Sequence, residues 1–182
     1  MNHSDHVALL QPGFAALDAV APSGAVWADL GAGQGAFTRA LADLLGPGAT
    51  IHTIDRDRRA LEQGAAETTH LFPRVTIVPH AADFSAPLLL PPLDGLVMAN
   101  ALHFVRDGDK EPLLRRLRAL LKPGGRFLLV EYNVDRGNMW VPHPLAYDTW
   151  RALATRAGFA QVTLLARAPS RFLGEFYASA AW

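Results

Sequence analysis

The chain has 182 residues, of which 50% are hydrophobic and 19% are charged, and it contains no cysteine. This length favours one domain over two, and the lack of cysteine excludes disulfides, a thiolate nucleophile and zinc sites built from cysteine. Lys and Arg number 17, as do Asp and Glu, so no net charge draws the chain to nucleic acid or to an anionic membrane. No apolar run reaches the roughly 20 residues of a membrane span, and residues 1–10 do not resemble a secretory signal, so we expect a soluble, cytoplasmic protein.

Short apolar runs alternate with segments of helical period along the chain. The runs predict strands over residues 25–30, 50–54, 75–78, 93–99 and 127–132. The helical periods predict helices over residues 37–45, 58–71, 109–121 and 145–157. Strands joined by helical crossovers form a mostly parallel sheet with helices on both faces, so the predicted fold class is α/β, doubly wound.

Glycine and proline mark the breaks between these elements. Gly64 is a weak point within the second helix, and the prolines between residues 87 and 92 predict an irregular stretch. Pro123-Gly124-Gly125 is expected to stop the third helix, whose arginines at 115, 116 and 118 we interpret as a solvated face. Two last apolar runs, 159–166 and 172–180, are separated by residues 168–171 and would pair as an antiparallel hairpin. A short N-terminal segment, 1–24, has room for one helix around Gly13 to Val20.

The turn after the first strand has the composition of a ligand-binding turn. It reads Asp29-Leu30-Gly31-Ala32-Gly33-Gln34-Gly35, in which glycines allow a sharp turn and the close approach of a ligand to the backbone. Asp55, at the end of the second strand, is placed to accept hydrogen bonds from ribose hydroxyls. This pair indicates an adenosine ligand and leaves open whether the ligand is NAD or another adenosine compound.

Further signals follow the next strands. Ala82-Asp83-Phe84 offers an acceptor for an adenine amino group and an aromatic cover for the ring, and Asn100-Ala101-Leu102-His103 follows the fourth strand. Together with residues 28–35, Asp55, 93–103 and 121–131, this pattern resembles the class I S-adenosylmethionine-dependent methyltransferases, from about residue 25 to the C-terminus.

The resemblance implies a Rossmann-like sheet of seven strands with an antiparallel last strand, in one domain, 1–182, with a short cap over 1–24 and a cofactor-binding core over 25–182. It also implies S-adenosylmethionine as the cofactor. The residues that it implies for cofactor binding are Asp29 at the amino group, Gly31, Gly33 and Gly35 at the methionyl part, Asp55 at the ribose, Asp83 and Phe84 at the adenine, and Asn100 near the sulfonium, together with Ala32 and Arg56.

Two residues are candidates for catalysis, if the acceptor has a proton to lose. His103 follows a strand end and could act as a general base near neutral pH, and Glu131 ends the fifth strand. A histidine simply packed in a loop is an equally good interpretation of His103. The loop with Met139, Trp140 and His143 could form an acceptor pocket or close the core.

The same residues suggest the partners. No histidine pair has metal-ligand spacing with a supporting carboxylate, so we predict no metal. Ala101-Leu102-His103 stands where enzymes that methylate amino groups of nucleic acid bases carry prolines. This difference disfavours nucleic acid as the acceptor and favours a small-molecule methyl acceptor. We also expect no membrane partner. A short cap leaves the cleft open or closed by a second subunit, as in a homodimer.

Two other functions remain open at this point. The first is a nicotinamide-dependent oxidoreductase, since Gly31-x-Gly33-x-x-Ala36 satisfies the relaxed dinucleotide pattern. Against it, the chain has no room for a substrate domain, and Tyr147 is followed four residues later by Arg151 where short-chain dehydrogenases have lysine. The second is an S-adenosylmethionine-binding module without catalysis, which would form no S-adenosylhomocysteine from an acceptor.

Overall fold

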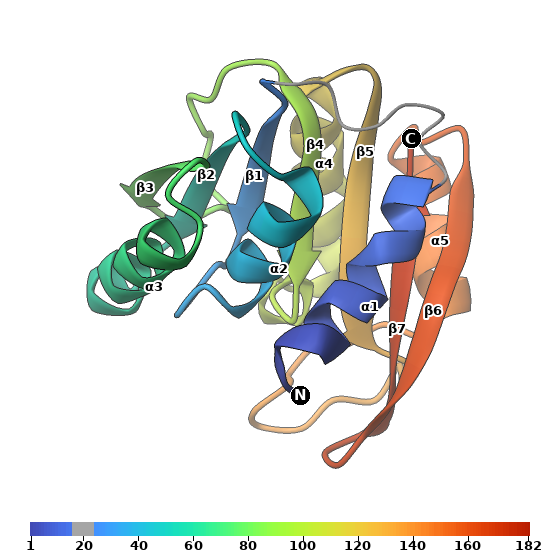
Figure 1. Cartoon of the computed structure of the whole chain (residues 1–182). Helices are drawn as coiled ribbons and strands as arrows, with labels where there is room; N and C mark the ends of the chain where they lie inside the picture. The colour runs from blue at the N-terminus through green and yellow to red at the C-terminus, as the bar shows by residue number, and fades with distance from the viewer. Residues whose placement is uncertain (16–23) are drawn as a thin grey trace.

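The apolar runs form one seven-stranded sheet (Figure 1). The computed structural model describes residues 1–15 and 24–182. The strands are β1 (Val26–Leu30), β2 (Thr50–Asp55), β3 (Thr76–Ala81), β4 (Leu93–Ala99), β5 (Leu121–Tyr132), β6 (Val162–Ser170) and β7 (Gly174–Ala181). They lie in the order β3-β2-β1-β4-β5-β7-β6, with β1 to β5 parallel and β7 antiparallel to both of its neighbours. The predicted fold class and the terminal hairpin are confirmed.

Helices cover both faces of the sheet. They are α1 (His3–Ala15), α2 (Ala36–Leu45), α3 (Arg58–Leu71), a short 3-10 helix η1 (Leu102–Phe104), α4 (Asp107–Ala119) and α5 (Tyr147–Arg156). In Figure 1, α1, α2 and α3 lie in front of the sheet, and α4 and α5 lie behind it. A separate cluster of buried apolar side chains lies on each face. Among the residues described, no helix is long and apolar enough to cross a membrane.

The N-terminal helix begins earlier than expected. It runs over His3–Ala15, whereas the sequence suggested a helix around residues 13–20, of which 16–20 lie outside the described residues. Leu9 and Leu10 are buried, and α1 packs on α2 and on β6. The described part of the N-terminal segment therefore covers one face of the sheet, and its role as a cap stays a prediction.

The boundary between α4 and β5 differs from the prediction because strand pairing overrides the helical pattern. The helix ends at Ala119 rather than 121, and the backbone N–H of Leu93 in β4 donates to the carbonyl of Leu120. Leu121 already pairs with Leu93, and the register shifts before Gly95 pairs with Arg126. Pro123-Gly124-Gly125 thus lies in an irregular part of β5 and does not itself stop the helix.

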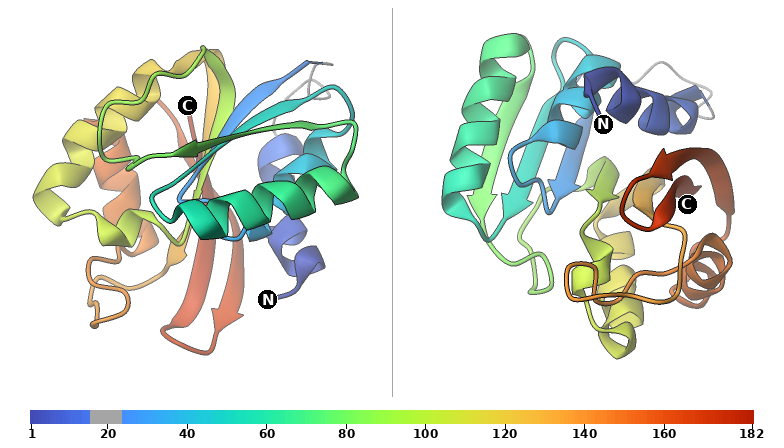
Figure 2. Two further views of the ribbon diagram at one scale, coloured as in Figure 1. Left: turned by 90° about the vertical axis from the view of Figure 1, so that its left-hand side faces the viewer. Right: turned by 90° about the horizontal axis from the view of Figure 1, so that it is seen from below.

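The two strands at the edges of the sheet end later in the chain than predicted and include prolines. β3 extends through Pro79 to Ala81, and β6 includes Ala168, Pro169 and Ser170, which we expected to separate the last two strands. A proline lacks an N–H donor, and an edge strand tolerates it because one side needs no partner. The hairpin turn is therefore formed by residues 171–173, and Figure 2 shows it projecting beyond the sheet.

Candidate functional site

The glycine turn between β1 and α2 adopts a conformation that favours glycine. Gly31, Gly33 and Gly35 all have positive φ, of 77°, 50° and 77°. A Cβ on Gly31 would lie 2.5 Å from the Cβ of Ala101, the residue after Asn100 at the end of β4. The turn after β1 therefore approaches the end of β4 too closely for any side chain at position 31.

Asp55 ties this turn to the end of β2. Its Oδ2 accepts a hydrogen bond of 2.8 Å from the backbone N–H of Gly33, and its Oδ1 accepts one of 2.8 Å from Asp57. The backbone N–H groups of Gly31 and Ala32 donate to the carbonyl of Ile54. The two sequence signals, the glycine turn and the acidic strand end, thus form one hydrogen-bonded unit.

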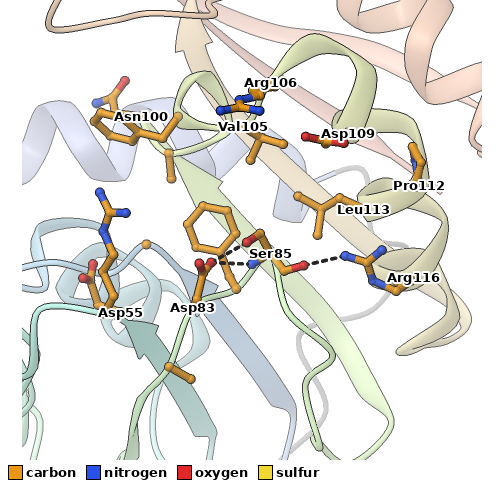
Figure 3. A pocket seen from close by; sticks show the side chains of 16 residues that line it. Asp55, Asp83, Ser85, Asn100, Val105, Arg106, Asp109, Pro112, Leu113 and Arg116 are labelled. Atoms are coloured by element: carbon orange, nitrogen blue, oxygen red, sulfur yellow. Dashed lines mark hydrogen bonds between the residues drawn. The ribbon is translucent and has the colours of Figure 1, made fainter.

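A cavity of about 840 Å³ lies beyond the carboxyl ends of β1 to β4. Six of the predicted residues line it, several of which are labelled in Figure 3: Gly31, Asp55, Arg56, Asp83, Phe84 and Asn100. The other predicted residues do not line it: Asp29, Ala32, Gly33, Gly35, His103 and Glu131. The structure therefore brings together the residues assigned to the ribose and the adenine on one wall.

The opposite wall comes from η1, α4 and the segment between them, and no motif in the sequence indicated it. Arg106, Asp109 and Leu113 line this side, as does Arg116, whose guanidinium donates to the Ser85 carbonyl over 2.6 Å (Figure 3). Arg115, Arg116 and Arg118 are all exposed, as the interpretation of a solvated face predicted, and Arg116 also lines the cavity. The helical period shows which residues face away from the core but not that a loop passes over that face.

Asp83 lines the cavity and also accepts local hydrogen bonds. Its Oδ1 accepts from the backbone N–H of Ser85 at 2.8 Å and from the Ser85 hydroxyl at 2.7 Å. These hydrogen bonds lower the pKa of the Asp83 carboxyl group. The carboxylate is thus held in the charged form, which accepts hydrogen bonds from a ligand.

Asn100 has a positive φ angle and a side-chain oxygen without a hydrogen-bond partner in the described chain. Among the described residues it is the one non-glycine residue with positive φ, 52°, and asparagine tolerates this region better than most residues. Its side-chain Oδ1 is buried and has no hydrogen-bond partner within the described chain. Buried polar atoms without a partner are rare in proteins, and this one belongs to a residue that lines the cavity.

Asp29 lies in the interior at the end of β1. It is 1% exposed, and its Oδ2 accepts a hydrogen bond of 2.5 Å from the Thr38 hydroxyl on α2. Burial raises the pKa of the Asp29 carboxyl from 3.8 to about 6, although the Thr38 hydrogen bond opposes this shift, and the charge of Asp55 adds to it. The charged carboxylate is therefore less favourable in the folded protein than in the unfolded chain.

Replacing Asp29 by asparagine should stabilise the protein above pH 6. An acid whose pKa is higher in the folded protein than in the unfolded chain stabilises the fold at a pH below its unfolded pKa, near 4. This stabilisation is lost as the pH rises through the folded pKa, about 6. Asparagine keeps the shape without the charge, so the variant should gain up to about 3 kcal/mol over the wild type at pH 7 and nothing at pH 4. Urea unfolding of both proteins between pH 4 and 7 measures this difference. A difference that does not change with pH would contradict the prediction.

His103 and Glu131 form a buried pair at the ends of β4 and β5. The Nδ1 of His103 lies 2.9 and 3.0 Å from the two carboxylate oxygens, and the His103 backbone N–H donates to Oε2 over 3.2 Å. Because a carboxylate only accepts hydrogen bonds, this contact places a proton on Nδ1 of His103. His103 is 3% exposed and Glu131 is fully buried.

The pair lies next to the cavity wall. The His103 ring contacts that of Phe104, with centroids 4.3 Å apart, and Phe104 and Ala101 line the cavity. On another side the ring centroid lies 5.9 Å from that of Tyr132, whose pKa is raised by burial and by the charge of Glu131. The two residues selected for possible catalysis thus form one unit, an oriented imidazole one side chain away from the cavity.

Comparison with known proteins shows the family to which the chain belongs. A family model described as a methyltransferase domain matches residues 28–127, more than half of the chain. Acetylserotonin O-methyltransferase of Mus musculus is 33% identical over 157 residues, covering 75% of this chain and 39% of the mouse protein. Ribosomal RNA small subunit methyltransferase H of Bradyrhizobium diazoefficiens is 35% identical over 103 residues, covering 54% of this chain and 30% of that protein.

Solved structures show the same fold. Human N-acetylserotonin methyltransferase in complex with SAM superimposes with a TM-score of 0.66 at 22% identity, covering 97% of this chain and 51% of the human chain. This chain spans about two fifths of the length of the mouse relative, so the similarity concerns one part of that protein.

Proposed function

Because this chain belongs to the class I S-adenosylmethionine-dependent methyltransferases, we propose that it transfers the methyl group of S-adenosylmethionine to a hydroxyl group of a small-molecule acceptor. The observation that carries the choice of a hydroxyl acceptor is the His103–Glu131 pair, an imidazole whose Nδ1 is occupied and whose Nε2 is not. A hydroxyl must lose its proton during transfer, and such an imidazole can accept it.

The cavity fits the adenosine part of the cofactor. Its volume lies within the range of roughly 300–1,000 Å³ that is usual for ligand sites. Gly31 lines the cavity, and the side-chain Oδ1 of Asn100 is a buried acceptor that has no donor within the described chain. A ligand with ribose hydroxyl and amino groups would supply such donors.

We assign the parts of the cofactor to the residues as follows. Asp55 and Arg56 bind the ribose, Asp83 and Phe84 bind the adenine, and Asn100 lies near the sulfonium. The methionyl part follows the turn of Gly31, Ala32, Gly33 and Gly35, with Asp29 near its amino group. A nearby ammonium would favour the charged form of Asp29, which burial alone disfavours.

The chain's own part in the reaction is to orient the acceptor and remove its proton. When bound, S-adenosylmethionine supplies the methyl group and a good leaving group. His103 Nε2 would accept the proton that the acceptor hydroxyl loses as its oxygen bonds to the methyl carbon, and the sulfur of the cofactor would keep the electrons of the broken carbon–sulfur bond. Glu131 holds Nδ1–H and stabilises the imidazolium that results.

Two observations support a small-molecule acceptor. The name of the mouse relative describes a small molecule methylated on oxygen, and the chain has no excess of basic residues to bind RNA phosphates. The Bradyrhizobium relative is named for ribosomal RNA, so RNA is the alternative acceptor.

We also propose that the protein is cytoplasmic. In addition, we propose that a second subunit covers Phe104, whose side chain lies beside the cavity and is 54% exposed.

Cofactor binding is tested by titrating the protein with S-adenosylmethionine, S-adenosylhomocysteine and NAD while the melting temperature is followed. We expect only the two sulfur compounds to stabilise the wild type, by about 2.7 kcal/mol at 100 times the dissociation constant. Asp55→Ala should abolish this stabilisation. Asp94→Ala is the matched control, because Asp94 also accepts a 2.8 Å hydrogen bond from a backbone N–H, that of Val26, but lies at the amino end of β4.

The activity is tested with S-adenosylhomocysteine formation as the signal. Hydroxylated small molecules should support its formation, and RNA should not. Stabilisation by NAD alone, or by none of the three ligands, would overturn the methyltransferase proposal. Binding without product from any acceptor would favour a module that binds S-adenosylmethionine without catalysis.

A further inference from the structure

Lys110 is a buried lysine that the proposed reaction does not use. It lies on α4 and is 2% exposed, and its Nζ donates to Asp107 Oδ1 over 2.7 Å and to the His143 carbonyl over 2.6 Å. Burying an ammonium group costs several kcal/mol unless it is well paired. The ion-pair partner, Asp107, has a side chain that is 77% exposed. The carboxylate lies at the surface, so the contact with His143 is the one that ties the ammonium to another part of the fold.

His143 is held at both of its backbone groups. Its carbonyl accepts from Lys110, and its N–H donates to the carbonyl of His103 over 3.0 Å. The main chain of His103 is thus held from two sides, since Glu131 accepts from its N–H. Two successive hydrogen bonds through one residue of the 133–146 loop therefore connect Lys110 with the main chain of His103.

The rest of this loop is organised by its own hydrogen bonds. Asn138 Oδ1 accepts from the backbone N–H groups of Trp140 and Val141, and a Cβ on Gly137 would lie 2.3 Å from the Val141 carbonyl oxygen. Ala146 donates to Asp135. These bonds shape the loop internally, whereas the bonds of His143 attach it to α4 and η1.

We propose that Lys110 is a positioning residue for methyl transfer. It fixes the 133–146 loop against η1 and thereby holds the His103 backbone, and with it Nε2, in place relative to the cavity. Its importance for catalysis rests on the proposed function, but the attachment itself does not. Displacement of a catalytic group by about 1 Å can reduce turnover on the order of 100-fold. A residue that holds the base in position therefore affects the rate without contacting the substrate.

The test compares Lys110→Met with Lys122→Met. Methionine keeps the length of the side chain and removes its donors, so the His143 carbonyl loses its partner. Lys122 also pairs with a carboxylate, at 2.9 Å from both oxygens of Asp94, but at the opposite end of β5 from Glu131. The measurements are amide hydrogen exchange of residues 133–146 and 102–104 and the NMR signals of the His103 imidazole nitrogens, with S-adenosylmethionine affinity followed in the same samples.

In Lys110→Met we expect exchange in the two segments to rise at least about tenfold and the His103 nitrogen signals to shift or broaden, with affinity changed less than about threefold. With an acceptor found in the screen above, turnover should fall at least about tenfold at unchanged KM for S-adenosylmethionine. Lys122→Met should show none of these changes. Asp107→Asn keeps an acceptor for Lys110 and leaves the hydrogen bond of Lys110 to the His143 carbonyl, and it changes only the longer contact, 3.9 Å, of Asp107 Oδ2 with His143 Nδ1, so it should resemble the wild type.

Unchanged exchange and unchanged His103 signals in Lys110→Met would overturn the proposal. So would a rise in exchange throughout β4 and β5, because that result indicates general destabilisation rather than release of one loop. Loosening in Asp107→Asn equal to that in Lys110→Met would show that charge pairing, not attachment of the loop, is what matters. If the wild type does not bind S-adenosylmethionine, the proposed function fails, whatever the exchange measurements show.

Discussion

Replacing His103 by alanine should lower methyl transfer by about 10²- to 10⁴-fold, the usual contribution of a general base. The geometry supports this size because Glu131 accepts from Nδ1 and from the backbone N–H of the same residue, so ring orientation and tautomer are both set. Glu131→Gln keeps the shape of the pair but offers a donor as well as an acceptor. We expect a smaller loss for it, on the order of 10- to 100-fold.

Turnover of His103→Ala should be compared with cofactor affinity and with the free energy of unfolding, because the substitution removes the imidazole partner of the buried Glu131 carboxylate and leaves it only backbone donors. We expect S-adenosylmethionine affinity within about threefold of the wild type, since His103 does not line the cavity. His70→Ala, an exposed histidine in the last turn of α3, is the control and should leave turnover unchanged. Normal turnover of His103→Ala with the true acceptor would remove the residue from the mechanism.

The sequence predicted the elements wherever local pattern alone decides them. α3 and β4 match their predicted ranges, because the helical period of one and the apolar run of the other are bounded by clear breaks. The start of β5 was missed because the pairing of Leu121 with Leu93 is a contact between distant residues. Likewise Pro79 and Pro169 were expected outside the strands but lie within β3 and β6. The prediction failed because the sequence does not show which strands lie at the edge of the sheet.

The same distinction holds for the site. Asp55, Asp83 and Asn100 could be selected from the sequence because parallel strands bring their carboxyl ends to one side of the sheet. The pairing of His103 with Glu131 could not, because it depends on β4 and β5 being neighbours. The burial of Lys110 could not be predicted from the sequence, because a lysine near the start of an amphipathic helix is normally exposed.

Gly64 is the most informative of the misjudged residues. In the sequence it weakens the pattern of α3, whereas in the structure it lies against the glycine turn. A Cβ at position 64 would lie 2.6 Å from the carbonyl carbon of Gln34 and 2.8 Å from the backbone nitrogen of Gly35. These are backbone atoms, and the Gln34 carbonyl already accepts a hydrogen bond from Arg39. α3 and the turn therefore contact each other directly through their backbones.

Gly64→Ala should consequently destabilise the protein and weaken S-adenosylmethionine binding together. Alanine in a helix normally stabilises by roughly 0.5–1 kcal/mol over glycine, but a forced contact with backbone costs about 1–3 kcal/mol, so we expect a net loss of stability. The helix can relieve the contact only by moving away or by displacing Gln34 and Gly35, which changes the turn that we assign to the methionyl part. We therefore expect affinity to fall at least about tenfold, a loss of about 1.4 kcal/mol.

Gly108→Ala is the matched control, because Gly108 also lies in a helix and its added Cβ would meet no heavy atom within 4 Å. Urea unfolding and S-adenosylmethionine titration of the two variants separate contact from helix propensity. Gly108→Ala should match or exceed the wild type in stability and match it in affinity. A Gly64→Ala protein with wild-type stability and affinity would mean that the turn moves without effect on the cofactor, and its close packing would then serve the fold alone. Lower stability with unchanged affinity would place the methionyl part of the cofactor away from Gln34 and Gly35.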